Sequence, residues 1–330
     1  MAALKQLERL EHSGAVGAER TWCVRWNRNG VLLASCGENK SIRIWRRNAD
    51  SGGFEPLSVL KGDHERAVRY LDFSPCGNYL ASVGFDAVII IYQFENGDFE
   101  EVTRMEGHEN EVKCCMFSPS GRYLASCSRD KSVWFWQMDE DEDFQVCSIL
   151  QPHTGDVKFV TWHPTEEVLV SCSYDCSLKF YRFDGEDWVT QQRIENAHES
   201  TVWSASFNSD GNYLATAGAD HRVNIWKRVY DDSTTSVACS SWKKLIGYEI
   251  DNCIWPLYTI SWNQYIDIIA VAGGDFRIRL LQFDRSSETI TELLSLMAED
   301  EVNSVSWNPE DPAILAAATD DGFVTVYELV

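Results

Sequence analysis

Residues 108–136 read HENEVKCCMFSPSGRYLASCSRDKSVWFW, and this stretch decides the fold because its pattern recurs along the chain. An aspartate follows the first histidine by 22 residues, a hydroxyl residue stands four before that aspartate, and an aromatic residue stands six after it. The four residues are His108, Ser126, Asp130 and Trp136. The same offsets recur in three more sets: His64, Ser82, Asp86 and Tyr92; His153, Ser171, Asp175 and Tyr181; His198, Thr216, Asp220 and Trp226. The chain is therefore built from repeated units.

Weaker copies of the pattern extend it toward both ends of the chain. One precedes the strong sets and two follow them: Ser35, Asn39 and Trp45; Cys253, Asp275 and Leu281; Ala298, Asp321 and Tyr327. Since successive histidines are 44, 45 and 45 residues apart, the whole chain accommodates seven such units. The first, sixth and seventh units lack a histidine at the expected position, and we expect them to depend more on apolar packing.

Within each unit the local pattern is that of short antiparallel strands. Residues 112–117, 123–126 and 132–136 are rich in β-branched and aromatic residues, and Ser-Pro-Ser-Gly-Arg forms a turn between the first two runs. A unit of about 45 residues with four strands is a propeller blade, and seven blades close a ring. The last blade has no fourth strand of its own, so we expect residues 3–11 to supply it and cover the open edge.

The sequence thus predicts a single all-β domain, a seven-bladed β-propeller over residues 1–330 with four antiparallel strands in each blade. The predicted blades cover approximately residues 12–55, 56–101, 102–146, 147–190, 191–240, 241–291 and 292–330, with the last completed by 3–11.

Charge and composition exclude several classes of function. The chain carries 29 basic and 51 acidic residues, a net charge of −22, which argues against binding to nucleic acid or an anionic membrane surface. No run of 18 apolar residues occurs, so we expect no membrane span. The first ten residues are too charged for a secretory leader, and the 11 cysteines then indicate a reducing compartment, the cytosol.

Two motifs carry a resemblance to a known family. EGHENEVK at 106–113, followed by LASCSRDKSVWFW at 124–136, resembles the WD40 propellers and, more narrowly, the WD-repeat subunit of the cytosolic iron–sulfur protein assembly targeting complex. SPCGNYLAS at 74–82, HESTVWS at 198–204 and SVSWNPEDP at 304–312 fit the same family, so the resemblance runs from about Thr21 to Leu329. It implies that the repeated histidine, hydroxyl, aspartate and aromatic residues form buried structural hydrogen-bonded chains, here called tetrads.

Tests for catalytic or metal chemistry give negative results. His-Glu occurs at His64, His108 and His198, but a zinc-protease motif needs a second histidine four residues on, where valines stand. No Cys-x-x-Cys pair exists, which removes the commonest spacing for zinc and iron–sulfur ligands. We therefore expect no enzyme activity and no catalytic, cofactor-binding or metal-binding residue.

A set of cationic and aromatic residues is the best candidate for partner binding. The blade register places them at the narrow end of the ring: Arg20, Trp22, Arg69, Phe85, Lys113, Arg129, Lys158, Tyr174, Trp203 and Tyr258. Arginine and aromatic side chains often dominate interface energies. Because Ala219, Gly274 and Asn303 leave blades 5–7 bare at these positions, we expect recognition of an acidic peptide over blades 1–4. A C-terminal carboxylate beside an aromatic residue is one form of such a peptide.

Within this set Arg129 lies in the stretch that most resembles the family, and we expect it to contact partners. The alternative is that Arg129 merely pairs with a neighbouring acid.

The resemblance implies a non-catalytic docking subunit needed for maturation of extramitochondrial iron–sulfur proteins. The implied partners are a HEAT-repeat adaptor, a small subunit with a reactive cysteine, an iron-only-hydrogenase-like cluster carrier and the client apoproteins. The implied location is the cytosol, with a share in the nucleus left open. The alternative of the same fold is a general WD40 adaptor in a ubiquitin-ligase or chromatin complex.

Overall fold

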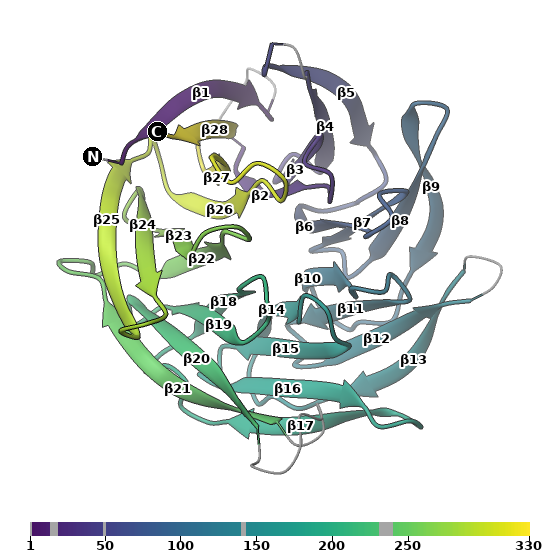
Figure 1. Cartoon of the computed structure of the whole chain (residues 1–330). Coiled ribbons are helices and arrows are strands. Elements are labelled where there is room, and N and C mark those ends of the chain that lie inside the picture. Colours follow the sequence, from purple (N-terminus) through teal and green to yellow (C-terminus); the bar gives the residue numbers. More distant parts are fainter. Residues whose placement is uncertain (1, 14–18, 49–50, 140–142, 231–239) are drawn as a thin grey trace.

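The computed structural model describes residues 2–13, 19–48, 51–139, 143–230 and 240–330. These residues form seven four-stranded antiparallel sheets arranged as a ring (Figure 1). The predicted all-β, seven-bladed propeller is therefore confirmed. We number the sheets as blades 1–7 in chain order and name their strands from the centre of the ring outward.

Blades 1 to 3 contain the strands β2 (Thr21–Trp26), β3 (Leu32–Gly37), β4 (Ser41–Arg47) and β5 (Phe54–Lys61); β6 (Val68–Phe73), β7 (Tyr79–Gly84), β8 (Ile89–Glu95) and β9 (Asp98–Met105); β10 (Val112–Phe117), β11 (Tyr123–Ser128), β12 (Val133–Met138) and β13 (Phe144–Leu150). Blades 4 and 5 contain β14 (Val157–Trp162), β15 (Val168–Ser173), β16 (Leu178–Phe183) and β17 (Trp188–Ile194); β18 (Val202–Phe207), β19 (Tyr213–Gly218), β20 (Arg222–Tyr230) and β21 (Ser240–Glu249). Blades 6 and 7 contain β22 (Leu257–Trp262), β23 (Ile268–Gly273), β24 (Arg277–Asp284) and β25 (Thr289–Met297); β26 (Val302–Trp307), β27 (Ile314–Thr319), β28 (Phe323–Leu329) and β1 (Leu4–Glu11).

Burial along the strands explains why the sequence pattern is not a simple alternation. Every residue of the second strand in each blade is buried, as in β11 with the sequence YLASCS. These strands pack between two neighbouring blades, so both faces require small or apolar residues. The outermost strands are mostly exposed or half-buried because one face meets solvent, as in β9, where only Phe99 and Met105 are buried.

The expected blade boundaries after residues 55, 101, 146, 190, 240 and 291 fall within the outermost strands β5, β9, β13, β17, β21 and β25. None of the repeated histidine, hydroxyl, aspartate or aromatic residues lies on these strands. The repeat in the sequence therefore does not indicate where the outermost strands begin and end.

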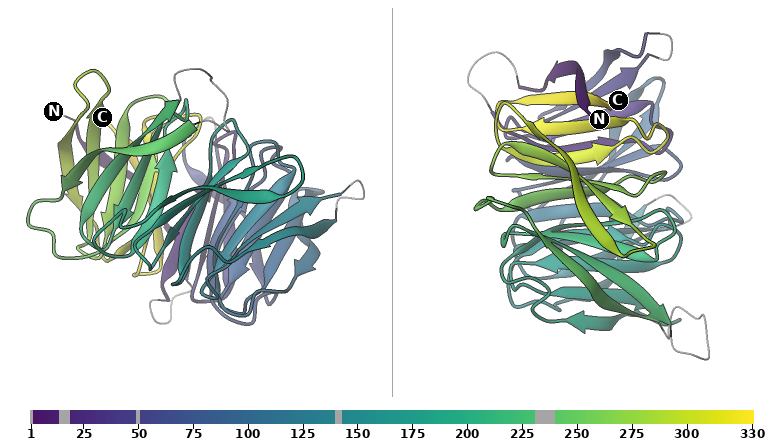
Figure 2. Two further views of the ribbon diagram at one scale, coloured as in Figure 1. Left: turned by 90° about the horizontal axis from the view of Figure 1, so that it is seen from below. Right: turned by 60° about the vertical axis from the view of Figure 1, so that its left-hand side comes forward.

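The two ends of the chain meet in blade 7, as predicted. Strand β1 pairs antiparallel with β28, with Leu4 opposite Leu329 and Leu10 opposite Val324. Figure 2 shows this first strand, in purple, lying along the yellow strands of the last blade. The pairing gives blade 7 its fourth strand and leaves β28 without an open edge.

Candidate protein-binding surface

The innermost strands explain how side chains reach one end of the ring. Each of these strands begins with a buried residue, and the pairing register shifts between its first and third residues. Such a β-bulge leaves the second residue outside the ladder and re-aims its side chain. The residues in this position are Trp22, Arg69, Lys113, Lys158, Trp203, Tyr258 and Asn303.

The residues before the repeated aspartates lie at the same end, which we call the entry end because the chain enters each blade there. The backbone amides of Phe85, Arg129 and Tyr174 donate to the carbonyls of Ala67, Glu111 and Asp156, at 2.9, 3.1 and 2.8 Å. Each acceptor directly precedes an innermost strand. These bonds hold the turn between the second and third strands next to the bulge residue.

One aromatic–cation cluster spans blades 1 to 3. The Trp22 ring lies 5.7 Å from the guanidinium of Arg20 and 5.2 Å from that of Arg69. The ring centroids of Trp22 and Phe85 are 6.2 Å apart, and the ammonium of Lys113 lies 4.5 Å from the Phe85 ring. These contacts join residues of three blades into one surface.

A second cluster spans blades 4 to 6 and has Lys158 at its centre. Its ammonium lies 5.6 Å from the Tyr174 ring and 5.1 Å from the Trp203 ring. Trp203 in turn meets Tyr258 edge to face, with ring centroids 5.2 Å apart. Nine of the ten predicted residues thus lie in one or other cluster. We call the ten together the rim.

Arg129, the tenth residue, makes a different contact. Its Nη1 lies 3.3 Å from Oε1 of Glu111, and 57% of its side chain is exposed. The pairing matches the alternative considered for Arg129, while the exposure leaves most of the guanidinium open to a partner.

Three acids pair with rim cations, and sequence reasoning placed Asp320 at this end of the ring but missed Glu111 and Asp156. Besides Glu111, Asp156 lies 3.1 Å from the ammonium of Lys158 and Asp320 lies 3.3 Å from the guanidinium of Arg20. A signal was present, because Glu111 and Asp156 stand two residues before Lys113 and Lys158. The pairings leave Arg69 and Lys113 as rim cations that form no ion pair within the described part of the chain.

Two further properties of the rim bear on what it can bind. Burial, together with the nearby Arg69 and Lys158, lowers the pKa of Lys113 to about 8 against the opposing effect of Glu111. The indole N–H groups of Trp22 and Trp203 are buried and have no hydrogen-bond acceptor among the residues described. The cations of the rim favour an anionic ligand, while the two indole N–H groups are enclosed and lie out of its reach.

The expectation of a bare rim over blades 5–7 needs a correction at blade 6. There Ile254 and Trp255, in the connection before β22, are 79% and 50% exposed. Phe276 and Met297, 39% and 56% exposed, lie close together, because Ala298 donates to the Phe276 carbonyl. The register of the bulge residues could not reveal these side chains, since they lie in connections and at a strand end.

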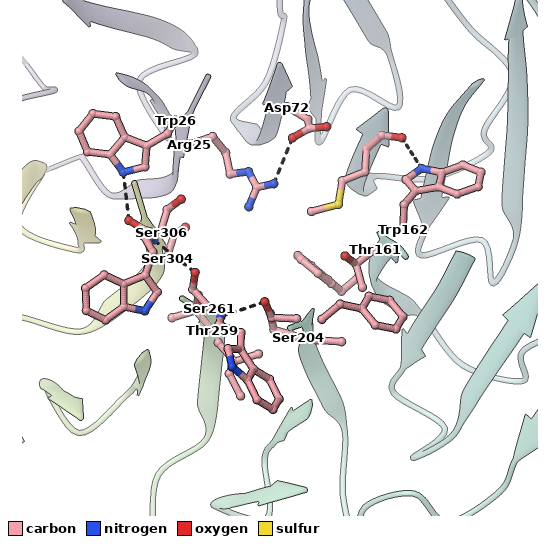
Figure 3. A pocket seen from close by; sticks show the side chains of 18 of the residues that line it. Arg25, Trp26, Asp72, Thr161, Trp162, Ser204, Thr259, Ser261, Ser304 and Ser306 are labelled. Atoms are coloured by element: carbon pink, nitrogen blue, oxygen red, sulfur yellow. Dashed lines mark hydrogen bonds and ion pairs between the residues drawn. The ribbon is translucent and has the colours of Figure 1, made fainter. Parts of the chain in front are cut away.

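A channel of about 500 Å³ runs within the ring, lined by residues of the innermost strands (Figure 3). Its hydroxyl groups link neighbouring blades: Ser304 accepts from the Val24 amide at 3.3 Å, and Thr259 from the Val305 amide at 3.0 Å. Arg25 donates to Asp72 at 3.1 Å, and this carboxylate also accepts from the Phe117 amide. The polar groups of the channel therefore hold the blades together.

The tetrads have the connectivity of a serine–histidine–aspartate triad. In blade 3, Nδ1 of His108 donates to Asp130 at 2.8 Å and Nε2 lies 2.8 Å from Oγ of Ser126. Ser126 is fully buried and also accepts from the Trp136 indole at 2.9 Å. Since no substrate can reach a hydroxyl enclosed in this way, the geometry supports a structural role.

The other three strong tetrads repeat the histidine contacts, and their final residue is a tryptophan in blade 5 and a tyrosine in blades 2 and 4. His64, His153 and His198 contact their aspartates at 2.9 Å and their hydroxyl residues at 2.8, 2.6 and 2.8 Å. The final contacts are made by Tyr181 with Ser171, by Trp226 with Thr216, and by Tyr92, whose hydroxyl donates to Asp63.

Blade 1 does have a histidine, contrary to the sequence interpretation. His12 contacts Ser35 through Nδ1 at 2.7 Å and Asn39 through Nε2 at 3.1 Å. It was missed because it stands 27 residues before Asn39, whereas the other histidines stand 22 before their aspartates. Burial, together with Arg43 and Lys61, lowers its pKa to about 4 against the effect of the Asn39 hydrogen bond.

In blades 6 and 7 a polar side chain takes the place of the missing histidine, so these blades do not depend on apolar packing alone. In blade 6, Arg279 is buried and pairs with Asp275. In blade 7, Asp321 accepts from Thr319 and forms a 2.5 Å ion pair with Arg9 of β1. The expected dependence on apolar packing is corrected in both, because a partly buried carboxylate needs a partner whichever residue supplies it.

Cysteine positions show no sign of metal chemistry. Cys36, Cys127 and Cys172 are fully buried, and burial raises the pKa of each thiol well above its ordinary value. Among the described residues no three His, Cys, Asp or Glu side chains are grouped as metal ligands.

No helix that could span a membrane occurs among the residues described.

A ring of seven four-stranded blades held by histidine–hydroxyl–aspartate–aromatic chains defines a WD40-repeat protein. The model of the WD domain, G-beta repeat, matches residues 4–46, 54–93, 99–137, 144–182, 189–227 and 291–328. The unmatched stretch between 227 and 291 contains β22–β24 of blade 6, where Arg279 replaces the histidine.

Curated relatives narrow the class. The chain is 47% identical over 335 residues to the probable cytosolic iron-sulfur protein assembly protein CIAO1 homolog of Caenorhabditis elegans, covering 99% of each chain. It is 44% identical to the probable protein CIAO1 of Mus musculus, covering 94% of this chain and 93% of the relative. It is 41% identical to the probable protein Ciao1 of Culex quinquefasciatus, covering 94% of each. The chain belongs to the WD40 family of cytosolic iron–sulfur protein assembly proteins.

Proposed function

We propose that this protein is a non-catalytic docking subunit of cytosolic iron–sulfur protein assembly, and that its rim binds acidic segments of partner proteins. The names of its relatives support the process, and the WD40 propeller is a fold suited to scaffolding. The observation that carries the binding surface is the pair of linked clusters at the entry end. Arg69 lies there beside the Trp22 ring, and Lys113 lies beside the Phe85 ring.

A partner segment with carboxylates and an aromatic side chain fits this surface best. Carboxylates would pair with Arg69 and Lys113, and an aromatic group would pack on the exposed Tyr174. The apolar side chains Ile254 and Trp255 extend the surface toward blade 6. Such a segment can end in a C-terminal carboxylate.

The proposed partners are the apoprotein clients, the HEAT-repeat adaptor, the small subunit with a reactive cysteine and the iron-only-hydrogenase-like carrier. In this proposal the iron–sulfur clusters are cargo, and the chain itself ligates no iron–sulfur cluster. Its place of action is the cytosol, and clients of the nucleus would bring it there as well.

The test compares charge reversal at the two ends of one blade. Arg129→Glu changes the rim, and Arg122→Glu makes the same change in the exposed turn before β11, at the opposite end of blade 3. Proteins retained by each variant are identified by mass spectrometry, and both melting temperatures are measured.

We expect Arg129→Glu to lose iron–sulfur apoproteins and assembly factors while melting like Arg122→Glu, which retains them. Retention of ubiquitin-ligase or chromatin components instead would favour the general adaptor. Unchanged retention by Arg129→Glu, or loss of its fold, would remove Arg129 from the recognition surface.

A further inference from the structure

A second hollow lies at the entry end beside blade 1, apart from the rim contacts. It measures about 300 Å³, and its lining includes the cations Lys40, Arg43 and Lys61 together with Asn39 and Glu19. None of the three cations forms an ion pair or a side-chain hydrogen bond with another described residue, and Nε of Arg43 is buried without an acceptor. Three cations without partners are unexpected in a chain of net charge −22.

The equivalent place in blade 4 shows what normally balances such a cation. Lys179 lies opposite Ser171 on the neighbouring strand, as Arg43 lies opposite Ser35. Lys179 forms an ion pair with Glu195, and the tetrad acid Asp175 stands nearby in the same blade. The blade 4 cation therefore has its acid supplied by the protein.

Blade 1 carries the opposite charges at these two places. Leu60 and Ile194 are equivalent, because they lie opposite Ile42 and Leu178, so the next residue, Lys61, stands where blade 4 has Glu195. Asn39 stands where blade 4 has its aspartate. Blade 1 therefore lacks both acids of blade 4: neutral Asn39 replaces the aspartate, and cationic Lys61 replaces the glutamate.

Blade 6 supports the comparison independently. Its equivalent cation, Arg279, pairs with Asp275 and lies 3.9 Å from Glu292. Arg43 and Lys61 instead act on His12, where they add to the burial that lowers the pKa of this imidazole. The positive charges of Arg43 and Lys61 therefore already affect the neighbouring imidazole of His12.

We propose that this hollow is an anion-binding site for a phosphate group, held by Arg43 and Lys61 from the walls and Lys40 from the exposed turn. Guanidinium and ammonium groups bind phosphate oxygens through charge-assisted hydrogen bonds, and Asn39 offers an amide donor beside them. The phosphate takes the place that the carboxylate of Glu195 occupies in blade 4. Glu19 lines the same hollow as an opposing charge, which leaves two of the three positive charges uncompensated.

The volume indicates what carries the phosphate. A hollow of about 300 Å³ exceeds the size of one phosphate ion and lies at the lower end of the range for small-molecule sites. A phosphate ester fits it, either as a free metabolite or as a phosphorylated side chain of a polypeptide. The site stands apart from the proposed function, since none of its residues belongs to the rim.

The test uses pyrophosphate and O-phosphoserine as free probes and a short phosphoserine peptide as the second arm. Binding is measured by titration calorimetry and by ³¹P line broadening on the full chain. Lys61→Glu restores the blade 4 arrangement and supplies Arg43 with an internal carboxylate, so the variant is expected to fold at least as stably. Arg43→Gln removes the guanidinium, and Lys243→Glu, exposed on β21, is the control with the same charge change.

We expect saturable one-to-one binding that weakens by about tenfold or more in Lys61→Glu and Arg43→Gln and is unchanged in Lys243→Glu. Tighter binding of the peptide than of O-phosphoserine would identify a phosphorylated polypeptide as the source, and equal affinities a free ester. No saturable binding by the unmodified chain, or the same affinity in all variants, would overturn the proposal. Loss of client binding at the rim would not affect the proposal of a phosphate site in blade 1.

Discussion

Arg9 of the first strand and Asp321 of the last blade form a 2.5 Å ion pair across 312 residues of sequence. The same guanidinium lies 3.7 Å from the Phe323 ring. The ring is thus closed by a backbone ladder between β1 and β28 and by a side-chain contact that also gives Asp321 of blade 7 a cationic partner.

Removing residues 2–11 should make the protein associate with itself more than the full chain does. The deletion exposes the N–H and C=O groups of β28, and an unpaired edge strand pairs readily with another chain. Size-exclusion chromatography with light scattering measures the outcome. Arg9→Ala, which keeps the strand, should associate no more than the full chain and lower the free energy of unfolding by about 1 kcal/mol. A deletion variant that associates no more than the full chain would contradict the closure role of β1.

His108→Ala should be among the most destabilising single changes in the blades. It leaves the Asp130 carboxylate and the Ser126 hydroxyl buried without their partner, at a cost of about 3 kcal/mol. His12→Ala should cost about 1–2 kcal/mol, because its partners Asn39 and Ser35 are neutral. Denaturant unfolding at pH 7 compares the two, and equal losses would show that the charge of the aspartate is unimportant.

Acid should destabilise the protein in two stages. The pKa of His12 is lowered to about 4, so between an unfolded value near 6.5 and pH 4 the unfolded chain binds a proton that the folded chain does not. Stability therefore falls as pH falls through this window, by up to about 1.4 kcal/mol per pH unit from this group. His12→Gln should flatten that part of the curve, and an unchanged slope between pH 6.5 and 4 would contradict the assignment.

The second stage comes from the tetrad aspartates. Burial opposes the lowering of their pKa values, but hydrogen bonds from the histidines hold Asp86, Asp130, Asp175 and Asp220 below the ordinary range. Their contribution to stability is complete above the unfolded pKa, near 3.9, and is lost as pH falls below it. Thermal melts between pH 2 and 7 should therefore show a further drop below about pH 4.

Lys113 should react unusually fast with amine-selective reagents for a partly buried lysine. With a pKa of about 8, a large share of its amine is neutral at pH 8, where an ordinary lysine is almost wholly protonated. Competitive labelling followed by peptide mass spectrometry ranks it against the exposed Lys131. Glu111→Gln should increase the rate, since this carboxylate raises the Lys113 pKa. Slower labelling than Lys131 at all pH values would refute the prediction.

The sequence contained most of the fold because each strong unit carries a complete tetrad at constant offsets. His12 was not recognised because its distance to Asn39 includes a longer connection, since the strand before it belongs to blade 7. Arg279 was not recognised because in the strong tetrads a histidine of the preceding connection is the partner of the aspartate, whereas Arg279 lies on a strand, where blade 4 has Lys179. The rim residues could be predicted from the blade register because the bulge positions recur in every blade. Ile254 and Trp255 could not, because they lie in a connection of blade 6 that does not follow the repeat.

The pairing of β1 with β28 has a consequence for biosynthesis. Among the strands of the ring the ribosome makes β1 first, yet its partner β28 is the last to be made, so blade 7 cannot form until β28 has been synthesised. Blades 1 to 6 can assemble earlier, because each contains four strands that follow one another in the chain. Throughout elongation the nascent polypeptide therefore carries an unpaired leading segment, and premature termination anywhere before Phe323 would yield an open arc with no means of sealing itself.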